Sequence, residues 1–323
     1  MKAAFFNQTG GVEVLQYGDQ PDPVCGANDV LIRVRSTSMD RVDIYSREGS
    51  HGMRWPLPYI GGLDISGSIV EIGSAARIEY PNLKVGDAVL AIGSRSHAQL
   101  ALARAALTFP LPPNLDADAA GAMPMASRTA YEALQRVRIQ AGETVLVFAG
   151  ASGVGSYGIQ VARASGCRVI TTVGSEEKKA KALALGAHAA IDHYKEDIGK
   201  RVAELTEGAG VHVVLDHVGT PVWDAAFDAL RPFGRFITVG VTSGHRVNLH
   251  LGKMFVKGIE VCGIGRPGTA KMRTSMLGVL SLVELGLLKP EIHARFALPE
   301  IAQAHQLMES SNFFGKILLT VPQ

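Results

Sequence analysis

The sequence predicts an α/β protein with two parts, a β-rich lobe and a doubly wound parallel sheet. Residues 1 to about 120 form short apolar runs separated by Gly, Pro, Asp and Asn, which are typical of strands and turns. From Gly142 onward, strand-like and helix-like segments alternate. A glycine-rich turn joins the first of these strands to the first helix. A chain of 323 residues is long enough for about two such domains.

The β-rich lobe is predicted from apolar, partly alternating segments. Its clearest strands are Leu31–Arg35, Ile65–Ile72 and Ala88–Ile92. Between residues 117 and 140 the composition becomes helical, with many alanines. We therefore expect the lobe to end near that point.

The second part is predicted from strands that alternate with helices at Glu176–Leu185, Asp197–Thr206 and Pro221–Leu230. Such alternation is typical of a parallel sheet with helices on both faces. The expected strands are Val145–Phe148, Arg168–Val173, Ala190–Asp192, Val211–Asp216, Arg235–Val239 and Glu260–Gly263.

The last segment of the chain contains two helices and two strands. We expect a helix at Lys271–Leu285, a strand at Ala294–Ala297, a helix at Pro299–Met308 and a final strand at Lys316–Val321. Because a lone final strand would expose an unpaired edge, we expect it to return to the first lobe.

The glycine-rich turn carries the clearest chemistry. Gly153, Gly155 and Gly158 have G-x-G-x-x-G spacing after the apolar run Val145–Phe148. Gly153 permits a tight turn, Gly155 lets the backbone approach a pyrophosphate, and Gly158 lets the helix pack against the strand. The first helical N–H groups then face the phosphates. This context favours a dinucleotide site over a glycine turn without a ligand.

The end of the second parallel strand bears on which dinucleotide binds. An NAD site usually has Asp or Glu there to hold the ribose hydroxyls, but this chain reads Val173-Gly174-Ser175. Lys178 follows within one helical turn, where its ammonium could meet a 2′-phosphate. Glu176 and Glu177 argue in the opposite direction. The balance favours NADP(H).

The bulk composition excludes several other classes. Hydrophobic residues make up 47%, charged residues 19%, and the net charge is +2, so nothing points to nucleic acid or to a membrane surface. No apolar run is long enough to span a membrane, and the first residues lack a signal-peptide core, so we expect a cytoplasmic protein. Three scattered cysteines and ten histidines without ligand spacing predict no metal site.

Several motifs, taken together and in order, resemble one family, the zinc-independent medium-chain dehydrogenase/reductases, in their quinone oxidoreductase (zeta-crystallin-like) branch. The resemblance covers essentially the whole chain. Its motifs are Asp40–Tyr45, Gly61–Gly67, Val85–Val89, Thr129–Tyr131, Ala151–Gly155, Leu215–Gly219 and Phe314–Ile317.

The resemblance implies a GroES-like substrate and catalytic domain from residues 1–121 and 268–323. It implies a Rossmann dinucleotide-binding domain from residues 122–267, with the cofactor in a cleft between the two. It also implies a homodimer through the last Rossmann strand. Met39 and Leu63 stand where zinc-dependent relatives have ligands, and neither side chain can bind zinc.

The implied function is hydride transfer from NADPH to a quinone. A 2-alkenal, enone or enoyl-thioester acceptor and a non-catalytic, crystallin-like NADPH-binding protein stay open as alternatives. The implied catalytic residues are Tyr45, at the family's substrate-cleft tyrosine, and Asp40, where relatives usually carry Asn. His97 lies where relatives often carry Tyr and is either a loop residue or a substrate contact. The expected cofactor-binding residues are Thr129, Ser152, Gly153, Val154, Gly155, Gly174, Ser175, Lys178, Tyr194, Val218, Gly240, Val241, Thr242 and Lys316.

Overall fold

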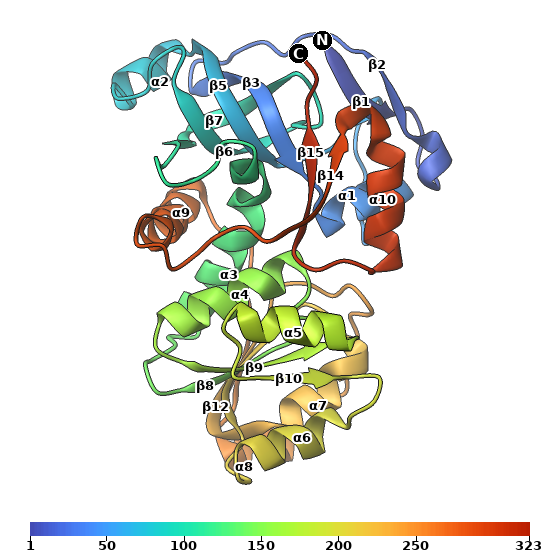
Figure 1. Ribbon diagram of the computed structural model, residues 1–323, viewed down its shortest axis with the longest axis vertical. Helices are drawn as coiled ribbons and strands as arrows, with labels where there is room; N and C mark the ends of the chain where they lie inside the picture. The colour runs from blue at the N-terminus through green and yellow to red at the C-terminus, as the bar shows by residue number, and fades with distance from the viewer. The chain divides into compact units, whose positions relative to one another are not determined.

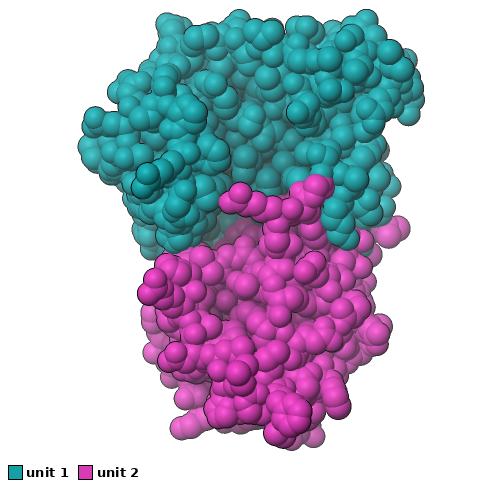
Figure 2. Space-filling view, turned by 180° about the vertical axis from the view of Figure 1, so that it is seen from behind, with its two compact units in different colours: residues 1–126, 269–284, 289–323 teal, residues 127–268, 285–288 magenta.

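The computed structural model describes residues 1–323 and divides into two compact units, coloured separately in Figure 2. Unit 1 contains residues 1–126, 269–284 and 289–323, and unit 2 contains residues 127–268 and 285–288. The boundaries expected from the sequence lie at 121/122 and 267/268. No helix in the structure combines the length and the apolar character needed to cross a membrane.

Unit 1 is built on a six-stranded sheet with the order β14-β15-β3-β5-β6-β7, in which β3 also pairs with β7. The pairs β3–β5, β5–β6, β6–β7 and β3–β7 thus form a closed ring, whose apolar interior includes Val30, Ile32 and Ile69. The bounds are β3 (Asp29–Ser38), β5 (Asp64–Ile72), β6 (Ala88–Ser94), β7 (Leu100–Pro110), β14 (Ile292–Ala297) and β15 (Lys316–Thr320).

The end of the chain joins this sheet, as expected. β15 pairs antiparallel with β3, with Leu318 opposite Ser38, and β14 lies beside β15 (Figure 1). A second, three-stranded sheet has the order β2-β1-β4 and consists of β1 (Lys2–Phe6), β2 (Gln16–Asp19) and β4 (Tyr59–Ile60).

The helices of unit 1 are short, apart from α9. α1 follows β3 directly and ends at Gly49, whose φ of 68° stops the helix in the left-handed region. The bounds are η1 (Val12–Val14), α1 (Arg41–Glu48), α2 (Ser74–Glu79), η2 (Ala119–Ala122), α9 (Thr269–Glu284), η4 (Leu298–Glu300) and α10 (Ile301–Ser310).

Unit 2 contains the predicted parallel sheet, and all six expected strands are present. Their order is β10-β9-β8-β11-β12-β13, and every neighbouring pair is parallel. The bounds are β8 (Thr144–Val147), β9 (Arg168–Val173), β10 (Ala189–Asp192), β11 (Val211–Asp216), β12 (Leu230–Thr238) and β13 (Glu260–Gly263). This order reverses at β8, so the loops after β8 and β11 flank the point where open α/β sheets bind ligands.

Helices cover both faces of this sheet, with α4 and α5 on one face and α6 and α7 on the other (Figure 1). Trp223 and Phe227 of α7 and Val202 of α6 join Leu146 and Ile170 of the sheet in one apolar core. The bounds are α3 (Pro124–Arg136, which begins in unit 1), α4 (Gly153–Ala164), α5 (Glu176–Ala184), α6 (Ile198–Leu205), η3 (Thr220–Val222), α7 (Trp223–Asp228) and α8 (Leu251–Lys257).

Candidate active site

The glycine-rich turn of unit 2 ends in a capped helix N-terminus. α4 begins at Gly153, and Oγ of Ser152 accepts the N–H of Gly155 at 2.9 Å. The first N–H groups of an α-helix have no acceptor within the helix, so those of Gly153 and Val154 point out of the turn. Together with the helix dipole, this donor set fits a pyrophosphate.

Close packing leaves little room for a side chain at two glycines of the fingerprint. A Cβ on Gly158 would lie 2.8 Å from Cδ2 of Leu215 on β11, which confirms the expected close approach of helix and sheet. A Cβ on Gly155 would lie 2.2 Å from the carbonyl oxygen of Ala149. The turn itself therefore excludes a side chain at Gly155, whether or not a phosphate is bound.

Three loops at the carboxyl edge of the sheet are tied together through His217. Nε2 of His217 lies 2.8 Å from Oγ of Ser152, and the carbonyl of His217 accepts both the backbone N–H and the hydroxyl of Thr242. The N–H of Ser243 donates to the carbonyl of Val218 at 2.8 Å. The structure thereby brings together the expected cofactor residues Ser152, Val218, Gly240, Val241 and Thr242.

His217 is absent from the residues expected from the sequence. It follows Asp216 at the end of β11 and lies within the family motif Leu215–Gly219. Its position in that motif could have identified it as a site residue. Asp216 shapes the loop, because its carboxylate accepts the N–H groups of Val218 and Gly219. Burial raises the pKa of Asp216 to about 6, against the effect of these hydrogen bonds.

The loops after β9 and β10 form a second group of expected residues. The ring of Tyr194 lies over Gly174, since a Cβ there would be 2.8 Å from Cε2 of the tyrosine, and the Tyr194 side chain is 80% exposed. Ser175 caps α5 by accepting the N–H of Lys178 at 3.2 Å. The structure thus gathers Gly174, Ser175, Lys178 and Tyr194 beside an exposed aromatic face.

The acidic residues near Lys178 have lysine partners of their own. Glu177 pairs with Lys181 at 2.6 Å, and Glu176 lies 3.7 Å from Nζ of Lys195. Lys178 is half-buried, and this burial lowers the pKa of its ammonium. The two glutamates that argued for NAD are therefore engaged with lysines, which favours the NADP(H) interpretation.

Thr129 lies on α3, on the part of that helix within unit 2. Its Oγ1 accepts a hydrogen bond from the guanidinium of Arg128 at 3.1 Å. Arg128 also pairs with Glu132 at 2.9 Å, and both of these charged side chains are buried. The buried pair fixes the helix turn that carries Thr129.

In unit 1, three charged side chains from three distant strands or loops form a buried cluster. Nζ of Lys316, on β15, lies 2.5 Å from Oδ1 of Asp40 and 3.2 Å from Oδ2 of Asp64. Lys316 is 2% exposed and Asp64 is fully buried. The ammonium expected to contact the cofactor is thus held by two carboxylates of its own unit.

The two carboxylates of the cluster have different surroundings. Asp64 accepts the hydroxyl of Ser38 and the N–H of Met125, each at 2.6 Å, in addition to Lys316. Asp40 has Lys316 on Oδ1, whereas its buried Oδ2 has no hydrogen-bond partner. Asp64 is therefore fully paired and Asp40 is half-paired.

Burial dominates the ionisation of this cluster. It raises the pKa of Asp40 to about 7, although Lys316 acts to lower it. Burial alone would lower the pKa of Lys316, but the two carboxylates outweigh it and hold that pKa above its usual value. The lysine consequently stays charged while Asp40 titrates near neutral pH.

Asp43 fixes the backbone around Asp40. Its Oδ2 accepts the N–H of Asp40 at 2.8 Å, and its Oδ1 accepts the N–H of Gly62 at 2.9 Å. Tyr45, on the next turn of α1, stacks on the ring of His51 with centroids 3.8 Å apart. The structure therefore places Asp40 at the N-cap of α1 and Tyr45 one turn further along that helix, but only Asp40 belongs to the charged cluster.

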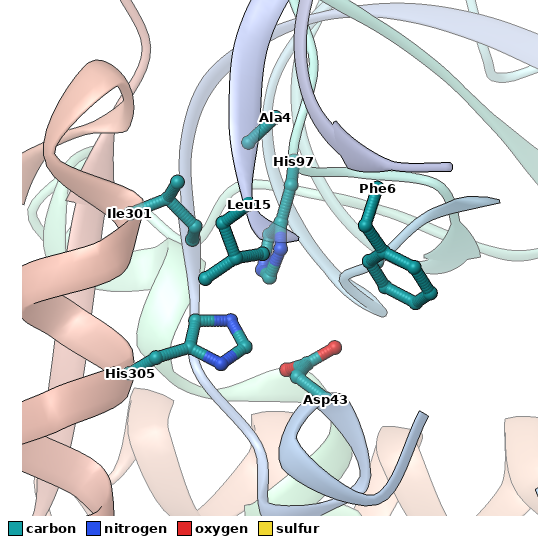
Figure 3. A pocket seen from close by; sticks show the side chains of 8 residues that line it. Ala4, Phe6, Leu15, Asp43, His97, Ile301 and His305 are labelled. Carbon is teal, nitrogen blue, oxygen red and sulfur yellow. The ribbon is translucent and has the colours of Figure 1, made fainter. Parts of the chain in front are cut away.

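His97 lies in the interior of unit 1 (Figure 3). With Asp43 and His305 it lines a cavity of about 10 Å³, roughly the room that one water molecule needs. His97 is 2% exposed, and its Nε2 lies 3.3 Å from the carbonyl oxygen of Ser38. This burial favours a structural role for His97 over contact with a substrate.

The side chain of Met39 has apolar surroundings. Met39 is fully buried in the core of unit 1, and its N–H donates to the carbonyl of Ile317 at 3.0 Å. No group of three or more His, Cys, Asp or Glu side chains in the structure is arranged to hold a metal ion.

The chain matches two family models. Residues 26–112 match the alcohol dehydrogenase GroES-like domain, and residues 153–281 match the zinc-binding dehydrogenase model. Over 97% of its length the chain is 32% identical to a quinone oxidoreductase of Pseudomonas aeruginosa, and 98% of that protein is covered. A quinone oxidoreductase of Rattus norvegicus is 31% identical over 99% of the chain and 97% of that protein.

Solved structures agree with the fold. A quinone oxidoreductase of Escherichia coli in complex with NADPH superposes with a TM-score of 0.87 at 27% identity, over 99% of this chain and 100% of that one. A mycobacterial protein in complex with NADPH gives 0.90 at 28% identity, with 99% and 100% covered. A structure described as an NAD-dependent alcohol dehydrogenase also gives 0.90 at 28% identity, with both chains fully covered.

Proposed function

Because the chain belongs to the quinone oxidoreductase branch of the medium-chain dehydrogenase/reductase family, we propose that it transfers a hydride from NADPH to a quinone. The observation that carries the cofactor assignment is the group after β9 and β10. There Tyr194 offers an exposed ring beside Lys178, and no carboxylate ends β9. Two structural relatives were solved with NADPH, which supports the same choice.

Unit 2 is the proposed dinucleotide-binding domain. The N–H groups of Gly153 and Val154 would hold the pyrophosphate, with Ser152 and Gly155 shaping the turn. Lys178 would meet the 2′-phosphate as a charge-assisted donor. The nicotinamide end would contact Thr129, Val218, Gly240, Val241 and Thr242. The adenosine end would contact Gly174, Ser175 and Tyr194.

Unit 1 is the proposed substrate and catalytic domain. The bound dinucleotide supplies the hydride, and the protein orients the reactants and handles the proton. Asp40 and Tyr45 are the proposed catalytic residues, and Lys316 acts through Asp40. A 2-alkenal, enone or enoyl-thioester acceptor is the second candidate, because an acid that titrates near neutral pH suits a product that must be protonated.

The test is NADPH oxidation with matched panels of quinones and enones, alongside direct titration of NADPH and NADH. We expect turnover with at least one panel and tighter binding of NADPH. Turnover with enones alone would select the second candidate. Binding of NADPH without turnover of any acceptor would indicate a non-catalytic NADPH-binding protein instead.

We also propose a homodimer through β13. This strand is the last of the sheet and pairs only with β12, so one edge of its backbone is open. Val261 on β13 is 37% exposed, and the nearby helix α8 exposes Phe255 and Val256. Sedimentation of the wild type and of Val261→Lys tests this, because a dimer through β13 should dissociate in the variant, whereas an unchanged mass would contradict it.

A further inference from the structure

We propose that Asp40 is the proton donor of the reaction, that it releases its proton from Oδ2, and that Lys316 and Asp64 position it. This inference rests on the proposed function and deepens it, since it requires an acceptor whose oxygen takes up a proton when its carbon framework is reduced. The starting observation is the buried cluster of Asp40, Lys316 and Asp64 in unit 1.

The cluster has an excess of negative charge when all three groups are ionised. Two carboxylates share one ammonium, and Lys316 and Asp64 have almost no exposed surface. A buried charge without a partner is costly, so a protein commonly neutralises it by taking up a proton. One proton makes the cluster neutral overall.

Hydrogen bonds decide which oxygen takes that proton. Asp64 accepts three donors, from Ser38, Met125 and Lys316, so each of its two oxygens already has a hydrogen-bond partner. Asp40 accepts only Lys316, on Oδ1, and its buried Oδ2 has no donor directed at it. The free position for the proton is therefore Oδ2 of Asp40.

The other charged groups around Asp40 act in the same direction. Asp43 of α1 and Asp64 of β5 both raise its pKa, and Lys316 of β15 is the one cation that lowers it. The carboxylate of Asp43 accepts the N–H groups of Asp40 and Gly62, and the backbone N–H of Asp43 donates to the main-chain carbonyl of Asp40, so neither group donates to the Asp40 carboxyl group. Geometry and charge thus agree on a neutral Asp40 with a proton on its unpaired oxygen.

The proton balance of the reduction is then complete. The dinucleotide provides the hydride, and the electron pair displaced in the acceptor moves onto its carbonyl oxygen. As the Asp40 carboxyl group, whose side chain is 16% exposed, turns Oδ2 toward the acceptor, its O–H bond breaks and a new O–H bond forms on the carbonyl oxygen, which yields a hydroquinone or an enol. Asp40 remains as a carboxylate paired with Lys316, and solvent returns its proton before the next cycle.

Infrared difference spectroscopy tests the protonation state without any turnover. In a pH titration of the wild type we expect the C=O band of a protonated carboxyl group to disappear as the pH rises through about 7. Asp40→Asn should lack this band, whereas Glu79→Gln, at an exposed site of α2, should keep it. Asp64→Asn should shift the titration to lower pH, because it removes a neighbouring negative charge.

Absence of a titrating band that depends on Asp40 would overturn the proposal. If the band is present but the protein turns over no acceptor, the proposed function fails while the protonated Asp40 stands. The two failures are therefore distinguishable.

Kinetics test the use of the proton. The wild-type kcat/KM should fall as the pH rises through the pKa of Asp40, since the donor is then lost. Asp40→Asn should remove this limb and lower kcat by about 10²-fold, the usual size of general-acid catalysis. Asp64→Asn should move the limb to lower pH, and the control Glu79→Gln, at an exposed site of α2, should keep both the limb and kcat. A full rate and an unchanged limb in Asp40→Asn would contradict the proposal.

Discussion

The two candidate sites of this protein are built in different ways. The dinucleotide turn of unit 2 is local: Ser152, Gly153 and Gly155 lie together in the sequence, and backbone N–H groups supply the chemistry. The charged cluster of unit 1 joins side chains from positions 40, 64 and 316, separated by up to 276 residues. A local site depends on backbone shape, whereas a long-range site depends on charge balance, so substitutions should damage the two in different ways.

The largest effect should come from a side chain in the local turn. Gly155→Val places a Cβ where it would lie 2.2 Å from the carbonyl oxygen of Ala149, so the turn must distort. We expect loss of measurable NADPH binding in calorimetry. Gly268→Ala is the matched control, because a Cβ there meets nothing within 4 Å. Retained NADPH affinity in Gly155→Val would show that the turn does not hold the dinucleotide.

The second effect probes charge balance in the long-range cluster. Lys316→Met leaves two carboxylates buried without their ammonium, which should cost about 3–5 kcal/mol of the free energy of unfolding. Denaturant unfolding measures this loss. Lys2→Met, which removes the cation of the exposed pair with Asp19, should change the stability little. Equal stability changes in both variants would mean that the cluster at Lys316 is not critical for folding.

A smaller effect separates recognition of the phosphate from the turn itself. Lys178→Ala should weaken NADPH binding by about 1.5–3 kcal/mol, the value of a charge-assisted contact, and should hardly change NADH binding. Lys179→Ala, whose lysine lies 3.5 Å from Glu196, is the control. Equal losses for both dinucleotides would show that Lys178 does not recognise the 2′-phosphate.

The smallest expected effect is none at all. Met39 is buried in the core of unit 1 and cannot bind zinc, so a chelator should leave NADPH oxidation unchanged. Elemental analysis of the purified protein checks the same point. Stoichiometric zinc together with activity lost to the chelator would contradict the assignment.

The same contrast between local and long-range sites explains what the sequence could predict. All six strands of unit 2 were predicted, because each is a short apolar run with a helix beside it in the chain. β7 was not predicted, since its segment Leu100–Pro110 alternates weakly and contains many alanines that fit a helix as well. α1 was also missed, because its polar sequence carries no apolar stripe of its own.

The candidate sites follow the same division. The cofactor residues around the turn could be named from spacing and family resemblance. The pairing of Lys316 with Asp40 and Asp64 could not, because only the antiparallel register of β15 on β3 brings these positions together. His217 could have been named from the family motif that contains it. Its contact with Ser152 could not, because that contact depends on how two loops fold against each other.

The pairing of β15 with β3 also sets an order for biosynthesis. β3 and β5 leave the ribosome long before β15, which carries Lys316, some 252 residues after Asp64. All of unit 2 is translated in the interval, and domains generally fold as units during synthesis. Asp64 therefore has no ammonium partner until β15, which carries Lys316, has left the ribosome. Until β15 has been synthesised, the nascent first lobe stays an incomplete sheet with an open edge at β3.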